Sequence, residues 1–168
     1  MRWIISSRLA AAAAAAMAVP LLAALWACAP APSSVITGEV VAIHDGDTLS
    51  VRAGGRTVRV RLACIDAPEQ GQAFGGRARQ QLAQEAMRRT VRVEVVDRDN
   101  FGRTVGRVWA DGTLVNLELV RAGLAWHYAR HCPGDRTLAA AEQVAWAARR
   151  GLWADREPVP PWRWRRRR

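Results

Sequence analysis

Acidic side chains and arginines gather in two short stretches of the sequence, His44–Glu69 and Asp99–Arg103. Together these stretches supply three carboxylates and two guanidinium groups, on Asp47, Asp66, Glu69, Arg61 and Arg103. Carboxylate oxygens bind hard cations such as Ca²⁺. A planar guanidinium donates paired hydrogen bonds to phosphate oxygens. This combination of side chains predicts a metal-assisted attack on phosphate.

The hydrophobic pattern indicates the elements that must position these residues. Apolar residues alternate with arginine around Arg61, as in a strand with one buried and one basic face. We expect five strands, at Val35–Ile43, Thr48–Arg52, Arg56–Ile65, Val91–Val96 and Arg103–Trp109. Helical spacing predicts three helices, at Arg77–Arg89, Leu114–Ala122 and Leu138–Arg150, with Asp135 or Thr137 capping the last. Short strands with interleaved helices fit an α+β, mainly β fold built on a five-stranded OB-fold barrel.

Residues 1–34 have the pattern of an export segment, because Arg2 and Arg8 precede a run rich in alanine and leucine. Three interpretations stay open. Cys28 becomes the lipidated first residue of a lipoprotein, an Ala-x-Ala site is cleaved after Ala29, or the apolar run of about 20 residues remains as a membrane anchor. Each interpretation places the rest of the chain outside the cytoplasm, in the cell envelope or secreted.

Two further cysteines, Cys64 and Cys132, lie far apart in the sequence. In an oxidising compartment they can form a disulfide, and the alternative is a pair of buried thiols on separate elements. A zinc site is not expected, since no Cys-x-x-Cys motif or histidine pair accompanies them.

The charge of the chain favours polyanionic partners. The net charge is +10 and all 25 basic side chains are arginine, although five of them stand in the last six residues. Such a chain attracts nucleic acid or an anionic membrane surface. Residues 155–168 are expected to form a tail in which Glu157–Pro161 is extended rather than packed. Trp162–Arg168 would then stack on bases and bind phosphates, insert at a membrane surface, or stay disordered.

A series of short motifs occurs in order from about Val35 to Trp153. The motifs are Asp45-Gly46-Asp47-Thr48, Arg61-Leu62, Ile65-Asp66-Ala67-Pro68-Glu69, Phe101-Gly102-Arg103, Ala110-Asp111-Gly112, Val115-Asn116, Leu119-Val120-Arg121-Ala122-Gly123-Leu124-Ala125 and Arg150-Gly151-Leu152-Trp153. The ordered set resembles the thermonuclease (staphylococcal-nuclease-like) family. The resemblance implies a nuclease-like OB-fold domain at residues 35–154, with three helices.

The resemblance also implies roles for the charged residues. Asp47, Asp66 and the backbone carbonyl of Ala67 would bind Ca²⁺, with Thr48 in support and Asp45 adjusting the charge. Glu69 would hold or deprotonate the attacking water. Arg61 and Arg103 would bind the scissile phosphate. The implied activity is a Ca²⁺-dependent endonuclease that hydrolyses DNA and RNA, single strands preferred, as a monomer, and leaves 3′-phosphate ends.

Two departures from the family pattern concern substrate binding. Asn100 and Phe101 stand where the family often has lysine and tyrosine, so Phe101 can stack on a base but cannot donate a hydroxyl to phosphate. Ala129 and His131 replace two tyrosines of the nucleotide pocket, with Tyr128 nearby. We therefore expect Phe101, Tyr128 and His131 to bind substrate.

Two other functions remain as alternatives. A non-catalytic nucleic-acid-binding module of the cell envelope would use the same barrel, but such modules usually lack some of the acids and arginines that this chain retains. An envelope lipoprotein with a structural or surface-binding role would account for both ends of the chain. It would leave Asp47, Glu69 and Arg103 without a role.

Overall fold

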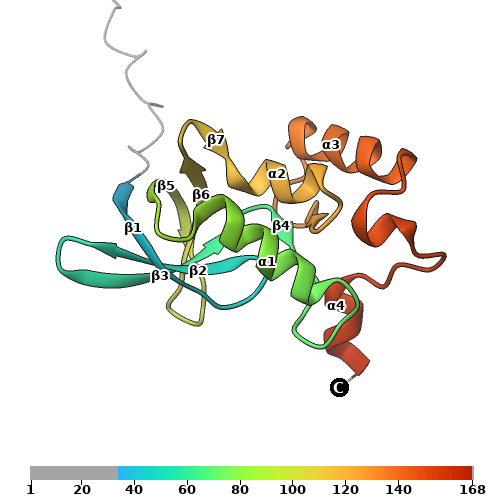
Figure 1. The fold of residues 1–168 in the computed structure, drawn as a ribbon, viewed down its shortest axis with the longest axis horizontal. Coiled ribbons are helices and arrows are strands. Elements are labelled where there is room, and N and C mark those ends of the chain that lie inside the picture. Colours follow the sequence, from blue (N-terminus) through green and yellow to red (C-terminus); the bar gives the residue numbers. More distant parts are fainter. Residues whose placement is uncertain (1–33, 168) are drawn as a thin grey trace, which may run out of the picture. The chain divides into compact units, whose positions relative to one another are not determined.

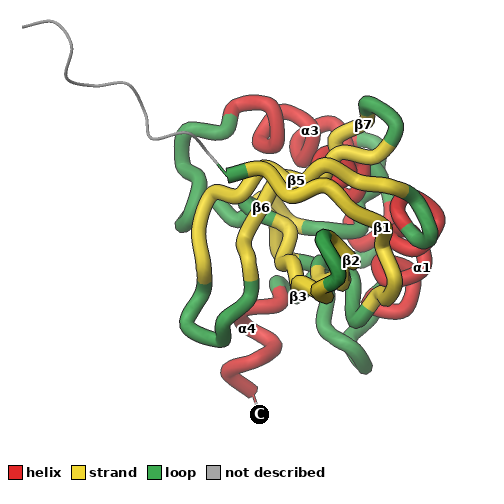
Figure 2. The backbone as a smooth tube through the Cα atoms, turned by 90° about the vertical axis from the view of Figure 1, so that its left-hand side faces the viewer, coloured by secondary structure: helices red, strands yellow, loops and turns green. Residues whose placement is uncertain are grey.

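Alternating apolar residues build five strands that form one sheet in the order β3-β2-β1-β5-β6. Their bounds are Val35–Ile43 (β1), Thr48–Ala53 (β2), Arg56–Leu62 (β3), Thr90–Arg98 (β5) and Thr104–Ala110 (β6). Neighbours in this order are antiparallel, whereas β3 and β6 pair in parallel and close the sheet (Figure 2). The predicted five-stranded OB-fold barrel is confirmed, with β7 (Thr113–Leu114) as a short extension beside β6.

The computed structural model describes residues 34–167. The predicted export segment, including Cys28, therefore lies outside the described residues apart from Ser34. Within the described range, no helix is both long enough and apolar enough to cross a membrane.

Three longer helices pack around the barrel, in agreement with the predicted number (Figure 1). They are α1 (Gly75–Ala86), α2 (Val115–Arg121) and α3 (Arg136–Ala147). Helix α1 buries Ala78, Leu82 and Ala86, which recur every four residues and so form one apolar face. A fourth helix, α4 (Pro161–Trp164), and two 3₁₀ helices at Gly151–Ala154 and Arg165–Arg167 complete the set.

The strand expected at Arg56–Ile65 is interrupted. Strand β3 ends at Leu62, and Cys64 adopts a left-handed backbone conformation with φ of 66°. After this turn, β4 (Ile65–Asp66) pairs with β8 (Trp126–His127) in a separate two-stranded sheet. The turn is tied to the barrel, because the Ala63 N–H donates to the Gly106 carbonyl at 2.8 Å. Because of this break, Asp66 lies on the separate short strand β4 and not on β3.

The C-terminal segment differs from the expected unpacked tail. Glu157–Pro160 is free of regular structure, as expected, but Pro160 and Pro161 are buried. Proline suits the first turn of a helix, where its missing N–H has no partner to lose, and Pro161 begins α4. The segment therefore packs against the domain and continues into helical turns as far as Arg167.

Candidate nuclease active site

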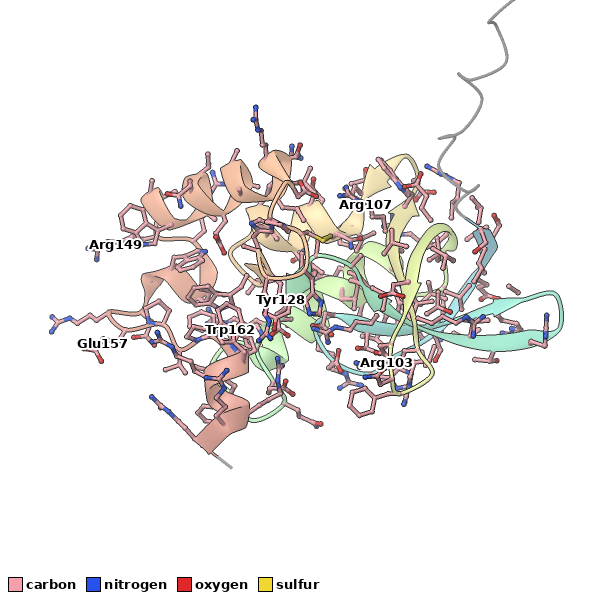
Figure 3. The ribbon with its side chains drawn as sticks, turned by 180° about the vertical axis from the view of Figure 1, so that it is seen from behind. Arg103, Arg107, Tyr128, Arg149, Glu157 and Trp162 are labelled. Carbon is pink, nitrogen blue, oxygen red and sulfur yellow. A yellow bond between two sulfur atoms is a disulfide. The ribbon has the colours of Figure 1, made fainter. Side chains whose placement is uncertain are left out.

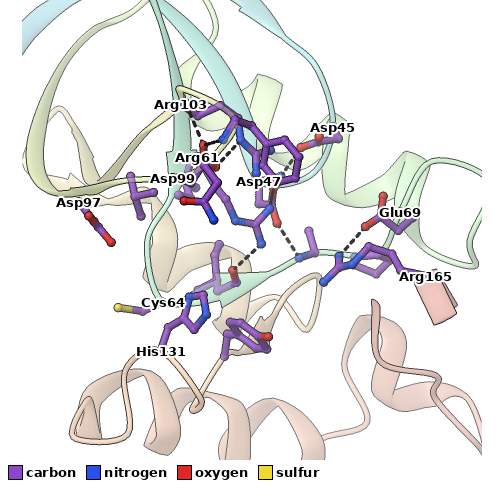
Figure 4. Close-up of a pocket in the computed structure, with 18 residues that line it drawn as sticks. Asp45, Asp47, Arg61, Cys64, Glu69, Asp97, Asp99, Arg103, His131 and Arg165 are labelled. Carbon is purple, nitrogen blue, oxygen red and sulfur yellow. Dashed lines mark hydrogen bonds and ion pairs between the residues drawn. The ribbon is translucent and has the colours of Figure 1, made fainter. Parts of the chain in front are cut away.

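A cleft of about 450 Å³ opens beside β3 and β4 (Figure 4). Its walls come from the Asp45–Asp47 turn, β3 with the turn after it, the loop after β4, the turn between β5 and β6, the loop after β8, and Arg165 of the C-terminal segment. Nearly every residue with a predicted role lines the cleft or contacts a residue that does. They are Asp47, Thr48, Arg61, Asp66, Ala67, Glu69, Phe101, Arg103, Tyr128 and His131.

One guanidinium joins the two predicted metal-binding acids. Arg61 Nη1 donates to Asp47 Oδ1 at 3.0 Å, and Nη2 donates to Asp66 Oδ1 at 2.9 Å. Both carboxylates are buried, with side chains 5% and 1% exposed, respectively. Burial would lower the pKa of Arg61, but the two acids outweigh it and raise that pKa. The Arg61 guanidinium therefore holds the two carboxylates side by side, and the carboxylates in turn favour the charged form of Arg61.

Asp47 is placed by a tight set of backbone contacts. Its Oδ2 accepts from the Ala67 N–H at 3.1 Å, and its Oδ1 also accepts from the Thr48 hydroxyl at 3.0 Å. Gly46 allows this close packing, since a Cβ there would lie 2.6 Å from the Ala78 Cβ and 2.7 Å from the Ala67 Cβ. The Asp-Gly-Asp turn is thus wedged between α1 and the loop after β4.

The electrostatics at Asp47 favour a cation. Burial raises its pKa to about 7; Arg61 opposes this rise, while Asp45 and Asp66 add to it. A raised pKa means that the charged carboxylate lacks enough compensating positive charge in its present surroundings. A bound cation would supply that charge. The electrostatic demand for positive charge at this point is what a metal-ligating carboxylate should show.

The donor set fits Ca²⁺. Asp47, Asp66 and the Ala67 carbonyl offer only oxygen atoms, which Ca²⁺ prefers, and Ca²⁺ accepts water for its remaining ligands. Among residues 34–167, no group of three or more histidine, cysteine, aspartate or glutamate side chains is arranged to hold a metal. A site of two carboxylates, one carbonyl and water is consistent with that result, because it needs no third side chain.

Glu69 lies on the loop after β4, with its side chain 36% exposed. Its backbone N–H donates to Gln72 Oε1 at 3.0 Å, which fixes the loop. Pro68 precedes it and restricts the backbone. Glu69 therefore presents a partly solvated carboxylate to the cleft.

Asp99 organises the turn that carries Arg103. Asp99 Oδ1 accepts from the backbone N–H groups of Phe101 and Arg103 at 3.0 and 2.9 Å, and Oδ2 accepts from Arg103 Nε at 2.7 Å. Burial would raise the pKa of Asp99, but these hydrogen bonds outweigh it and lower that pKa. Phe101 is 85% exposed, and the Arg103 guanidinium carbon lies 5.5 Å from its ring centroid. An exposed aromatic ring beside an arginine that is predicted to bind phosphate suits base stacking.

Cys64 and Cys132 are joined in a disulfide. The bond links the turn after β3 to the loop that carries Tyr128 and His131, whose rings lie 4.6 Å apart between centroids. The Tyr128 N–H also donates to the Cys64 carbonyl at 2.8 Å. Two of the three predicted substrate-binding residues are therefore fixed to the turn that leads into β4 and Asp66.

Sequence reasoning missed several residues that shape the site. Asp99 holds Arg103, Gln72 holds the Glu69 loop, and the buried Asn116 joins β6 to the turn after β3. The Asn116 carboxamide accepts from the Val108 N–H and donates to the Ala63 carbonyl, both at 2.9 Å. Arg165 also reaches the cleft. Two of them had a signal: Asn116 stands in one of the family motifs, and Asp99 begins the stretch Asp99–Arg103, although no role was predicted for either.

The fold and the cleft define a class of protein: an OB-fold barrel whose acids and arginines gather at one cleft. Comparisons with known proteins agree. The family model described as staphylococcal nuclease homologue matches residues 59–155. The chain belongs to this family, which confirms the resemblance found in the sequence.

Bacterial relatives match over most of their length. An Escherichia coli protein named ParB is 46% identical over 159 residues, which cover 89% of each chain. Micrococcal nuclease of Shigella flexneri is 44% identical over 170 residues, 95% of each chain. An uncharacterized endonuclease of Escherichia coli O157:H7 is 43% identical over 133 residues, 79% of this chain and 86% of the relative.

Proposed function

We propose that this protein is an exported, Ca²⁺-dependent endonuclease that hydrolyses DNA and RNA and leaves 3′-phosphate ends. Family membership supports the nuclease activity itself, since relatives are named micrococcal nuclease and endonuclease. One structural observation supports the reaction: the cleft gathers the Glu69 carboxylate, the Arg61–Asp47–Asp66 cluster and the Arg103 guanidinium.

Each residue has a role in the proposed reaction. Glu69 holds a water and takes its proton as the water oxygen bonds to phosphorus. The bond from phosphorus to the 5′ oxygen breaks, and this oxygen leaves with the electron pair and takes a proton from solvent. One product therefore carries a 3′-phosphate and the other a 5′-hydroxyl. Arg61 and Arg103 donate to the non-bridging oxygens, whose negative charge grows in the transition state. A cation bound by Asp47, Asp66 and the Ala67 carbonyl would further neutralise this charge.

The substrate side of the cleft supports a single-stranded substrate. Phe101 is exposed and can stack on an unpaired base, which it cannot reach inside a duplex. Tyr128 and His131 line the opposite part of the cleft. The His131 ring supplies a hydrogen-bond donor in place of a phenol.

The proposed location is outside the cytoplasm. Residues 1–34 have the composition of an export segment, through which Cys28 would be lipidated or the chain anchored. The disulfide between Cys64 and Cys132 supports an oxidising compartment. The domain encloses a complete set of catalytic groups in one cleft, which supports a monomer as the active form.

The experiment is degradation of single-stranded DNA by the full chain, with Ca²⁺ and then with excess chelator. We expect cutting with Ca²⁺, loss of cutting with chelator, and product ends that accept a label only after a 3′-phosphatase has acted. Binding without cutting in the presence of Ca²⁺ would instead support the non-catalytic nucleic-acid-binding module. Cutting that survives the chelator would overturn the metal requirement.

A further inference from the structure

A third arginine, from the C-terminal segment, occupies the cleft. Arg165 Nη2 donates to Asp66 Oδ2 at 2.8 Å. Its Nη1 donates to Asp66 Oδ1 at 3.2 Å. The same Nη1 donates to Glu69 Oε1 at 2.6 Å (Figure 4). The Arg165 side chain is 43% exposed while Asp66 is 1% exposed. The guanidinium therefore covers the Asp66 carboxylate and joins it to the carboxylate that is proposed to hold water.

The segment that carries Arg165 is anchored at several points upstream. Gln72 Nε2 donates to the Val159 carbonyl at 2.6 Å, which couples the segment to the Glu69 loop. The Trp162 ring lies 5.4 Å from Tyr128 and 5.6 Å from Trp126 between centroids (Figure 3). These contacts fix the course of the chain before it reaches the cleft.

The short helical turn then aims Arg165 at the acids. The Pro160 carbonyl accepts from the N–H groups of Arg163 and Trp164 at 2.9 and 3.0 Å, so the turn is closed by hydrogen bonds. Trp162 and Arg165 are three residues apart, and residues at that spacing lie on the same side of a helix. Packing of Trp162 against the wall of the cleft thus directs Arg165 into it.

The hydrogen bonds of Arg165 occupy the carboxylate oxygens that the proposed reaction needs for a cation and for water. Both Asp66 oxygens accept hydrogen bonds from guanidinium groups, of Arg165 and Arg61. A cation needs lone pairs of the same carboxylate and carries charge of the same sign as Arg165, so the two repel each other at that point. Arg165 Nη1 also donates a hydrogen bond to Glu69 Oε1, the oxygen atom to which the attacking water would bind.

We propose that residues Pro158–Arg167, here named the C-terminal strap, are autoinhibitory: they hold the Arg165 guanidinium on Asp66 and Glu69 until a cation displaces it. The cation binds as the strap opens, and Glu69 becomes free to hold water. This inference rests on the proposed function, because it takes Asp66 as a cation ligand.

The first test measures Ca²⁺ binding to the full chain by isothermal titration calorimetry, without nucleic acid. Arg165→Ala removes the competing guanidinium and is expected to bind Ca²⁺ at least tenfold more tightly than the natural chain. The matched control is Arg166→Ala, which removes the same charge from the same exposed 3₁₀ helix. We expect the control to stay within twofold of the natural chain.

The second test separates displacement from a simple charge effect. Hydrogen exchange of residues 158–167 in the natural chain is measured by mass spectrometry without and with saturating Ca²⁺. Displacement of Arg165 should open the turn, so we expect exchange at Arg163 and Trp164 to become at least tenfold faster with Ca²⁺. In Arg165→Ala, the exchange rate of these residues should depend little on Ca²⁺.

The outcomes distinguish the strap from the proposed function. Equal Ca²⁺ affinity in all three proteins, or unchanged hydrogen exchange on Ca²⁺ binding, would overturn the autoinhibitory role of the C-terminal strap. Either result would leave the nuclease proposal intact. If none of the three proteins binds Ca²⁺, the calcium site is overturned and the strap with it. Tighter binding by Arg165→Ala together with faster exchange in the natural chain supports both.

Discussion

Both predicted phosphate-binding arginines are held by acids before any substrate arrives. Arg61 is gripped by Asp47 and Asp66, and Arg103 by Asp99. A guanidinium that is fixed by hydrogen bonds loses less rotamer entropy when it binds phosphate than a free one does. The acids therefore have a second effect besides any contact with a cation: they preorganise the donors that are proposed to stabilise the transition state.

Glu69→Gln tests the role of the carboxylate that is proposed to hold water. The amide keeps the size of the side chain but cannot take a proton, so we expect kcat to fall about 10²–10⁴-fold. Because Glu69 is partly exposed, the melting temperature should hardly change. Cleavage of a single-stranded oligonucleotide under saturating Ca²⁺ measures the rate. A variant with the natural kcat would show that Glu69 has no part in the chemical step.

Arg103→Ala tests charge stabilisation of the phosphate. Loss of one preorganised donor should lower kcat/KM by about 10²–10³-fold. Arg98→Ala is the matched control, because Arg98 is an exposed arginine at the end of the neighbouring strand and does not line the cleft. If both variants lose activity to the same extent, Arg103 contributes only to the general basic charge.

At the scale of elements, local patterns predicted the strands and helices better than their breaks and ends. Strand β1 begins and ends at the predicted residues, since its apolar residues lie between the polar residues Ser34 and His44. The break at Cys64 had no local signal, because the left-handed conformation is imposed by long-range contacts with Gly106 and Cys132.

The C-terminal segment also shows that local sequence patterns do not reveal long-range packing, in this case packing at the candidate site. Its prolines correctly predicted an extended course, whereas its packing depends on Gln72, Trp126 and Tyr128, which are distant in the sequence. The family motifs identified the acids and arginines by residue. They gave no indication of Arg165, because it lies beyond the last motif.

Asp135, one of two predicted caps, caps α3 and allows a test of stability. Its Oδ1 accepts from the Leu138 N–H at 3.0 Å, and its Oδ2 accepts from Arg107. Asp135→Ala should lower the free energy of unfolding by about 1–2 kcal/mol at pH 7. Thr137→Ala, at the other predicted cap, is the control and should cost less than about 0.5 kcal/mol. Urea denaturation of each variant measures the difference.

The stability from Asp135 should depend on pH. Burial would raise its pKa, but the Leu138 N–H and the Arg107 guanidinium outweigh burial and lower that pKa in the folded state. A lowered pKa gives stability that is present above the unfolded-state value and is lost as pH falls through the folded-state value. The difference between natural chain and Asp135→Ala should therefore shrink below about pH 4. A constant difference from pH 7 to pH 2 would contradict this.

At the scale of the whole molecule, the arginine excess is distributed unevenly around the cleft. Arg165 is engaged by Asp66 and Glu69, whereas its neighbours Arg166 and Arg167 are exposed. The C-terminal strap therefore brings one arginine to the acids and carries two exposed arginines directly after it. These two can meet the phosphates of a strand that approaches the cleft while Arg165 still covers the acids.

Replacing Arg166 and Arg167 together by alanine should reduce the salt dependence of nucleic-acid binding. Each phosphate contact on a single strand contributes about 0.7 to the slope of log K against log salt, so the slope should become shallower by roughly 1.4. Fluorescence anisotropy of a single-stranded oligonucleotide with chelator present measures binding without cleavage. The control pair is Arg88→Ala with Arg121→Ala, since both are exposed and neither lines the cleft. Equal changes in both pairs would mean that net charge, rather than the position of the strap, sets the affinity.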